Sequence, residues 1–352
     1  MRIAALQPLG SSGRSAVHGG LTALALLFAG ACGTADMTSP GDVPTDPAGA
    51  RKREGATTSS SSALAGFRLH VASSSPALRQ ADSWRDSRPA DADLMARMGA
   101  QPTARWLNEW TGDPATTVSA TLSAASVAGQ VPIFVAYNIP HRDCGSFSAG
   151  GASRADSYRS WIRGFASGLL GRTAVVVLEP DAIAGAGCLA TDLQEERFTL
   201  LREAVDVLSD AGAMVYLDAG HPRWLSTETA AARLTRSGIA RAQGFALNVS
   251  NFVATSENVS YGNALSARVG GKRYLIDTSR NGLGPAADGV WCNPDGRALG
   301  DLPTTQSSHA LVDALLWVKV PGESDGACNG GPNAGVWWAE YGLGLAARSA
   351  SL

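Results

Sequence analysis

Acidic side chains follow several short apolar runs of this sequence, at positions where they could transfer protons. Glu179 and Asp181, separated only by a proline, come directly after the aliphatic run AVVVL. Asp143, Asp218 and Asp325 stand at or beyond the ends of three other runs. A carboxylate is costly to bury unless it is paired or put to chemical use. Because a protonated carboxyl donates a proton and an ionised one accepts it, these acids are candidates for general acid and base catalysis.

The apolar runs alternate with segments of helical apolar spacing, such as 157–171 and 193–212. Repeated strand–helix–strand order predicts an α/β fold, a distorted parallel βα barrel of the TIM-like type with seven or eight strands in a single catalytic domain. The carboxyl ends of barrel strands meet on one rim, so the acids should converge there. The predicted strands lie within residues 67–72, 104–110, 131–138, 174–181, 213–220, 244–251, 273–279 and 315–326.

The N-terminal segment 1–32 has the pattern of a signal peptide. Basic residues precede an apolar stretch that is too short to span a bilayer, and small residues then lead to Cys32. Cys32 resembles the lipid-acceptor cysteine of bacterial lipoproteins, although Ala29 stands where a leucine is usual. Lipidation of Cys32 and ordinary secretion are both open, and a lipid anchor would be the only link to a membrane. In either case we expect a secreted or extracellular protein.

Residues 33–66 contain few large apolar side chains and many Ser, Thr, Pro and Gly residues, which predicts a flexible linker. We therefore expect the catalytic domain to span residues 67–352. The chain has 29 basic and 31 acidic side chains, a balance that offers no electrostatic footprint for nucleic acid. An uncharged ligand fits better, and we expect the protein to act as a monomer without a cofactor.

Four cysteines remain once Cys32 is set aside: Cys144, Cys188, Cys292 and Cys328. In an exported protein an even number predicts two disulfides. Three pairings are possible, of which nearest-neighbour pairing, Cys144 with Cys188 and Cys292 with Cys328, is the simplest. No Cys or His spacing in the chain is typical of zinc.

Other catalytic motifs fit the sequence less well. The segment GESDG at 322–326 has the spacing of a serine-hydrolase elbow, but no histidine follows His309 to complete a triad. The glycine pattern at 185–190 lies too far beyond its strand for a dinucleotide site. A metal-dependent hydrolase could use His221 with nearby acids, yet neither HxH nor HExxH occurs. Acids and tryptophans on one rim are better suited to metal-free glycoside hydrolysis.

Seven segments resemble, in order, the motif series of glycoside hydrolase family 6 cellulases. The resemblance runs from about Phe67 to the C-terminus. It rests on YNIPHRDC (137–144), VVLEPDAI (176–183), YLDAGHPRWL (216–225), NVSNF (248–252), DTSRNGLGP (277–285), WCNPDGRALG (291–300) and LLWVKVPGESDG (315–326).

The resemblance implies an inverting mechanism with Asp181 as the general acid. Asp143 would lie beside Asp181 and raise its pKa, while Asp325 is the candidate base. Asp218 would support the site, and Tyr137 would press on the distorted sugar ring. Glu179 is expected to be structural.

The same resemblance implies a set of sugar contacts and one departure from the family pattern. The departure is Ala149, where the family has a serine that helps to hold the catalytic water; the adjacent Ser148 is expected to point elsewhere. Trp106, Trp224 and Trp291 would stack on sugar rings, and Asn108, His221, Asn251, Lys319 and Glu323 would form hydrogen bonds.

The loops that roof the cleft in the family's cellobiohydrolases are short here, after His221 and after Gly326. We therefore expect an open cleft and an endo-β-1,4-glucanase that acts on cellulose or a related β-glucan. A cellobiohydrolase of the same family and a non-catalytic glycan-binding lipoprotein are the alternatives.

Overall fold

The computed structural model describes residues 62–287 and 289–352, which belong to one compact unit, Ser59–Leu352. The predicted signal peptide, Cys32 and nearly all of the predicted linker lie outside the described residues. No helix among the described residues is both long and apolar enough to cross a bilayer.

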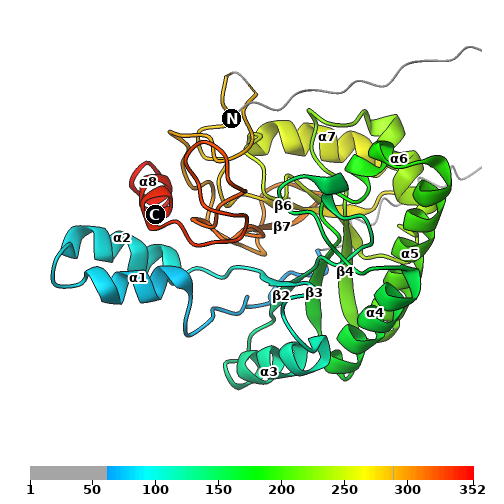
Figure 1. The fold of residues 1–352 in the computed structure, drawn as a ribbon, viewed down its shortest axis with the longest axis horizontal. Helices are drawn as coiled ribbons and strands as arrows, with labels where there is room; N and C mark the ends of the chain where they lie inside the picture. The colour runs from blue at the N-terminus through cyan, green and yellow to red at the C-terminus, as the bar shows by residue number, and fades with distance from the viewer. Residues whose placement is uncertain (1–61, 288) are drawn as a thin grey trace, which may run out of the picture. The chain divides into compact units, whose positions relative to one another are not determined.

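A seven-stranded parallel sheet forms the centre of the fold (Figure 1). Its strands follow one another in chain order, and each is parallel to the next. The sheet is strongly curled and forms a half-barrel, which confirms the predicted distorted barrel with seven strands. The strands are β1 (Arg105–Leu107), β2 (Ile133–Ala136), β3 (Ala174–Leu178), β4 (Ala213–Asp218), β5 (Gly244–Leu247), β6 (Arg273–Asp277) and β7 (Val312–Leu316).

Two of the predicted strands were wrong in whole or in part. Residues 67–72 form no strand and contribute only an isolated bridge, between Leu69 and Val131. None of these six residues is fully buried, so the segment lacks the two-sided burial of a barrel strand. The last strand, β7, begins at Val312, and most of the predicted segment 315–326 is loop.

Alternate side chains of the buried strands enter two different cores. On β2 and β3, Val135 and Val177 point to the inside of the curled sheet, whereas Phe134 and Val176 pack against the helices. Strands buried on both faces read as nearly continuous apolar runs, which is why β2 and β3 stand out in the sequence.

Helices α3 to α7 cover the outer face of the sheet (Figure 1). They are α3 (Pro114–Val127), α4 (Ala155–Leu169), α5 (Thr191–Asp210), α6 (Thr227–Arg236) and α7 (Thr255–Arg268). The side chains of Asp113 and Ser226 cap α3 and α6 by accepting hydrogen bonds from backbone N–H groups of the first turn.

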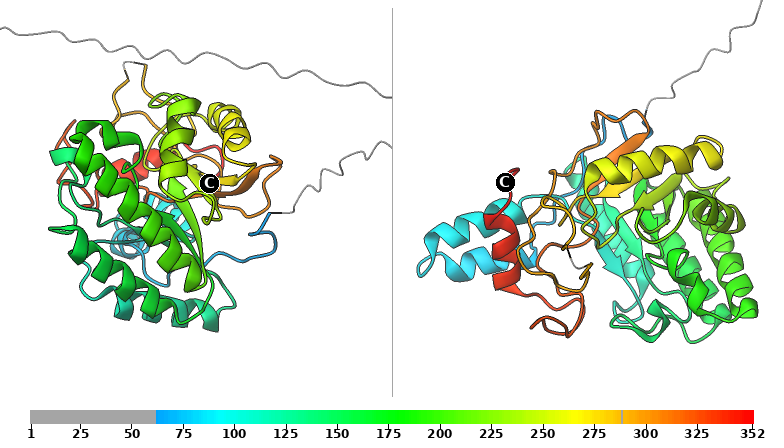
Figure 2. Two further views of the ribbon diagram at one scale, coloured as in Figure 1. Left: turned by 90° about the vertical axis from the view of Figure 1, so that its right-hand side faces the viewer. Right: turned by 90° about the horizontal axis from the view of Figure 1, so that it is seen from above.

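A second group of helices, α1 (Pro76–Trp84), α2 (Pro89–Gly99) and α8 (Ala339–Ala347), lies apart from these (Figure 2). The group buries a separate apolar cluster that includes Met98, Leu345 and Trp317. Two short 3₁₀ segments, Asp143–Gly145 and Ala184–Cys188, follow β2 and β3.

The edges of the sheet, β1 and β7, meet at a narrow seam. One parallel bridge joins Thr103 to Trp317, and the backbone N–H of Ala104 donates to the Trp317 carbonyl at 3.0 Å. The indole N–H of Trp106 donates to the carbonyl of Val318 at 2.8 Å. β1 and β7 therefore touch through these contacts and not through a full ladder.

Both predicted disulfides are present. Cys144–Cys188 joins the loop after β2 to the loop after β3, and Cys292–Cys328 joins the loop after β6 to the loop after β7. The nearest-neighbour pairing is confirmed, and each disulfide ties together two loops at the carboxyl end of the sheet.

Candidate active site

The carboxyl ends of the strands open onto a cleft of about 950 Å³. All the predicted catalytic and sugar-binding side chains except Asp218 line it. They are Trp106, Asn108, Tyr137, Asp143, Asp181, His221, Trp224, Asn251, Trp291, Lys319, Glu323 and Asp325. The fold thus brings together residues that are far apart in the sequence.

Asp181 adopts a left-handed backbone conformation, with φ at 68°, one residue after the proline that follows Glu179. Burial raises the pKa of its carboxyl well above the usual value. The negative charges of Asp218, Asp143 and Asp325, in that order, raise this pKa further. A raised pKa lets the carboxyl keep its proton at higher pH than an ordinary aspartic acid, which is what a general acid requires.

Asp218 lies behind the cleft wall, and its exposed fraction is 1%. Its Oδ2 accepts hydrogen bonds from the backbone N–H groups of Asp181, at 2.9 Å, and Gly220, at 3.3 Å. Burial raises the pKa of Asp218 to about 7, although these hydrogen bonds act in the opposite direction. The sequence interpretation named Asp143 as the residue that raises the pKa of Asp181. In the structure, burial and the charge of Asp218 raise the pKa of Asp181 more than Asp143 does.

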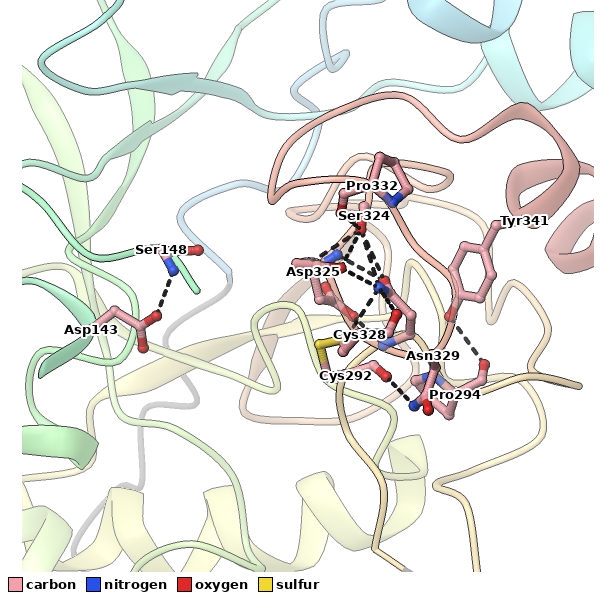
Figure 3. The surroundings of a disulfide bond; sticks show 12 residues. Asp143, Ser148, Cys292, Pro294, Ser324, Asp325, Cys328, Asn329, Pro332 and Tyr341 are labelled. Carbon is pink, nitrogen blue, oxygen red and sulfur yellow. Dashed lines mark hydrogen bonds between the residues drawn. A yellow bond between two sulfur atoms is a disulfide. The ribbon is translucent and has the colours of Figure 1, made fainter. Parts of the chain in front are cut away.

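Asp143 stands on the loop after β2, also with a positive φ of 54°. Its Oδ2 accepts a hydrogen bond from the backbone N–H of Ser148 at 2.8 Å (Figure 3). Ser148 lines the cleft and Ala149 does not. The turn closed on Asp143 brings Ser148 to the edge of the cleft, and the direction of the Ser148 hydroxyl stays a prediction.

Asp325 has the opposite electrostatic environment. Arg280 Nη1 lies 2.9 Å from its Oδ2, Lys319 Nζ lies 3.7 Å from its Oδ1, and the backbone N–H of Asn293 donates to it at 3.0 Å. Burial alone would raise the pKa of Asp325, but the two cations hold it below the usual value. Asp325 is therefore ionised and able to accept a proton.

Glu179 does not line the cleft and is fully buried. Its carboxylate accepts hydrogen bonds from the backbone N–H groups of Asn138, at 2.9 Å, and Ile139, at 3.0 Å. These contacts bind the end of β3 to the end of β2 and agree with the structural role expected for Glu179.

A scan against family models supplies the family. The model of "Glycosyl hydrolases family 6" matches residues 64–349. The chain belongs to glycoside hydrolase family 6.

Two bacterial proteins named endoglucanases are similar to this chain over most of the length of this chain. Endoglucanase A of Cellulomonas fimi is 45% identical over 266 residues, which is 75% of this chain and 58% of that protein. Endoglucanase 1 of Streptomyces halstedii is 44% identical over 262 residues, or 71% of this chain and 80% of that protein. The chain thus spans little more than half of the C. fimi protein.

A solved endoglucanase structure is also similar to this chain. The endoglucanase Cel6 from Mycobacterium tuberculosis, in complex with methyl-cellobiosyl-4-deoxy-4-thio-β-D-cellobioside, is 47% identical to this chain. The two structures superpose with a TM-score of 0.76, covering 80% of this chain and 97% of that one.

Polar side chains of this family 6 cleft suit hydroxyl groups. Burial lowers the pKa of His221 to about 4, so its imidazole is neutral at pH 7 and can both donate and accept. Burial raises the pKa of Glu323 and lowers that of Lys319. Among the described residues, no group of three or more His, Cys, Asp or Glu side chains is arranged to hold a metal ion.

Several cleft residues escaped the sequence interpretation. Trp110, Phe147 and Arg142 line the cleft, and Arg280 supports Asp325 from a fully buried position. Arg280 lies within the quoted motif DTSRNGLGP, so the motif carried a signal for it. The acidic partners of these two arginines, Glu109 for Arg142 and Asp325 for Arg280, are distant in sequence, and no local pattern reveals such pairs.

Proposed function

We propose that this protein is an inverting endo-β-1,4-glucanase that hydrolyses internal β-1,4 glucosidic bonds of cellulose or a related β-glucan. The observation that carries the proposal is the contrast between the surroundings of two carboxyls on one cleft: Asp181 lies among other acids, and Asp325 lies beside Arg280 and Lys319. The pKa of Asp181 is raised, so it holds a proton, and that of Asp325 is lowered, so it is ionised. Single-displacement glycoside hydrolysis needs one carboxyl with a raised pKa as the acid and one with a lower pKa as the base.

In the proposed reaction Asp181 gives its proton to the leaving glycosidic oxygen as the bond between that oxygen and the anomeric carbon breaks. Water attacks the anomeric carbon from the opposite face and forms the new C–O bond. The proton that the water loses is accepted on the Asp325 side of the cleft. Asp143 and Ser148 line the cleft beside this path, and the Ser148 hydroxyl is the group that we propose holds the water.

The relatives and the short loops support the endo mode over the cellobiohydrolase alternative. The similar proteins reported above are named endoglucanases, and the loops after His221 and Gly326 are short in the sequence. Exposed Trp224 and Trp291, 43% and 49% exposed, present flat apolar faces to a sugar chain.

The test is to incubate the protein with soluble carboxymethyl cellulose and follow both reducing ends and viscosity. We expect viscosity to fall early relative to reducing-sugar release, and NMR of freshly formed product to show the α-anomer. Asp181→Ala should lose about 10²–10⁴-fold in turnover because general acid catalysis is removed. A wild-type protein that binds the glucan but releases no sugar would leave the glycan-binding alternative.

We further propose that the protein acts outside the cell. Two disulfides are stable in an oxidising compartment, which supports export. Lipidation of Cys32 remains a proposal, and mass spectrometry of the mature N-terminus would decide between an acylated cysteine and a free secreted chain.

A further inference from the structure

Trp110 has the largest exposed fraction of the tryptophans in the described chain, 71%, and it lines the same cleft as Trp106. It follows β1 by three residues and belongs to none of the apolar clusters of the fold. Leaving most of an indole in water forgoes the burial free energy that a core tryptophan gains. The fold therefore gives no packing reason for a tryptophan at this position.

The turn that carries Trp110 is closed by local hydrogen bonds. The backbone N–H of Trp110 donates to Oδ1 of Asn108 at 3.0 Å, and the N–H of Asn108 donates to Oγ1 of Thr111 at 3.0 Å. The Thr111 hydroxyl in turn donates to the carbonyl of Asn108 at 2.6 Å. Asn108, predicted as a sugar contact, thus also fixes the backbone from which Trp110 projects.

A buried cation connects Trp110 to the inner part of the cleft. The guanidinium carbon of Arg142 lies 5.2 Å from the Trp110 ring centroid and 4.5 Å from that of Tyr137. Both Glu109 oxygens accept from Arg142, at 2.6 and 3.1 Å, so the cation is fixed. Tyr137 in turn meets the Trp106 ring edge-to-face at 5.1 Å. Two tryptophan faces thus stand on one cleft wall, with a rigid connection between them.

We propose that Trp110 is a platform for an additional glucosyl residue of the substrate, at the outer edge of the cleft beyond the Trp106 platform. The proposal rests on the proposed glucanase function. A β-linked glucosyl unit is uncharged and has an apolar C–H face, so it matches a rigid, largely exposed indole. A single exposed tryptophan among polar neighbours does not make the large apolar patch of a protein-docking surface.

The order along this wall follows from the contacts. Tyr137, Asp181 and Asp143 line the same cleft. Burial raises the pKa of Tyr137, and the negative charges of the two acids raise it further, which agrees with a position near them. Trp106 contacts Tyr137 directly, and Trp110 reaches it only through Arg142. Trp110 also follows the end of β1, the strand that carries Trp106, by three residues. We therefore place Trp110 further from the acids than Trp106, and only longer oligosaccharides should gain from the outer platform.

The experiment compares binding of cello-oligosaccharides of three to six glucosyl units to Asp181→Asn protein, with and without Trp110→Ala, by isothermal titration calorimetry. We expect the Trp110→Ala change to weaken the affinity for cellohexaose about fivefold to tenfold. The affinity for the shortest oligosaccharide that binds should stay the same. Trp110→Phe should retain part of the cellohexaose affinity that Trp110→Ala loses, because phenylalanine keeps an aromatic face. The matched control is Trp84→Ala, because Trp84 lies on α1 under Arg88 and does not line the cleft.

The inference would be overturned by equal cellohexaose affinity with and without the Trp110 side chain, or by the same loss of affinity for every chain length. A complete lack of oligosaccharide binding would also overturn it. Failure of the glucanase function is seen separately, as absence of sugar release by the wild-type protein. Binding to the Asp181→Asn variant does not depend on turnover, so the two failures are distinguishable.

Discussion

The backbone N–H of Asp181 donates a hydrogen bond of 2.9 Å to Oδ2 of Asp218, which lies behind the cleft wall. One buried carboxyl thereby acts on the proposed acid in two ways. It holds the backbone of Asp181 in its left-handed conformation, and its charge raises the pKa of the Asp181 carboxyl. An uncharged isostere should preserve the first effect and remove the second.

The first prediction concerns Asp218→Asn. An asparagine oxygen can still accept from the Asp181 N–H, but the negative charge that raises the pKa of Asp181 is lost. The alkaline limb of the kcat/KM profile, where Asp181 loses its proton, should move down by about one pH unit. Asp156→Asn, an exposed substitution on α4, serves as the control and should leave the profile unchanged. An unmoved alkaline limb in Asp218→Asn would remove Asp218 from the electrostatics of the acid.

A second prediction concerns the acidic limb of the kcat/KM profile, where Asp325 gains a proton. Arg280→Met removes the cation closest to Asp325, so the pKa of Asp325 should rise and the acidic limb should move to higher pH. Breaking a buried pair also costs about 3–5 kcal/mol of stability. Arg280→Lys keeps the charge and should show a smaller shift if the methionine variant folds poorly. The pKa of Asp325 lies below the ordinary value of 3.8, so the wild-type acidic limb falls below that pH. A steady-state profile that shows an acidic limb at higher pH in Arg280→Met than in the wild type would confirm the direction, and an unchanged profile in a folded variant would contradict it.

Ser148 provides a third prediction. Ser148 lines the cleft next to Asp143. Ser148→Ala would remove the proposed hydrogen bond between its hydroxyl and the catalytic water, so kcat should fall about fivefold to tenfold with little change in KM. Ala149→Ser restores the family's usual serine at a position that does not line the cleft, and it should bring no gain. A faster Ala149→Ser enzyme would show that the sequence interpretation of this loop was the better one.

The stability of the folded protein should decrease as the pH rises. Glu179 and Asp218 both have pKa values raised to about 7, from ordinary values near 4. Between these values the folded state binds more protons than the unfolded state, so stability falls with increasing pH. Tm measured by calorimetry should therefore be higher at pH 5 than at pH 8. The dependence should be weaker in Asp218→Asn, and a Tm that rises toward pH 8 would contradict the assigned directions.

Apolar runs predicted most strands because barrel strands are buried on both faces. β7 was placed too late for a definable reason: its second residue is Asp313, and a central acid argues against a strand. In the structure Asp313 is fully buried, pairs with Arg273 and accepts from the Tyr216 hydroxyl at 2.7 Å. These partners lie on β6 and β4, so the compensation for the buried charge is invisible until the sheet is assembled.

The candidate site, like the strands, was predicted from the sequence only in part. Residue types at strand ends, together with the family motifs, predicted the acids that gather at the cleft. What they could not supply was the relative influence of those acids, because burial and charge separation depend on the tertiary structure. Trp110 was missed for a related reason: as a sequence feature it resembles any other tryptophan, and its exposed fraction alone distinguishes it.

The two disulfides have a consequence for production of the protein. Each joins loops at the rim, Cys144 beside Asp143 and Cys328 three residues beyond Asp325, while the strands themselves contain no cysteine. A chain made in the reducing cytoplasm of an expression host should therefore assemble its sheet and helices yet carry a loosened rim. Far-ultraviolet circular dichroism would look native while specific activity is low, and exposure to glutathione redox buffer should recover that activity without any change in the spectrum.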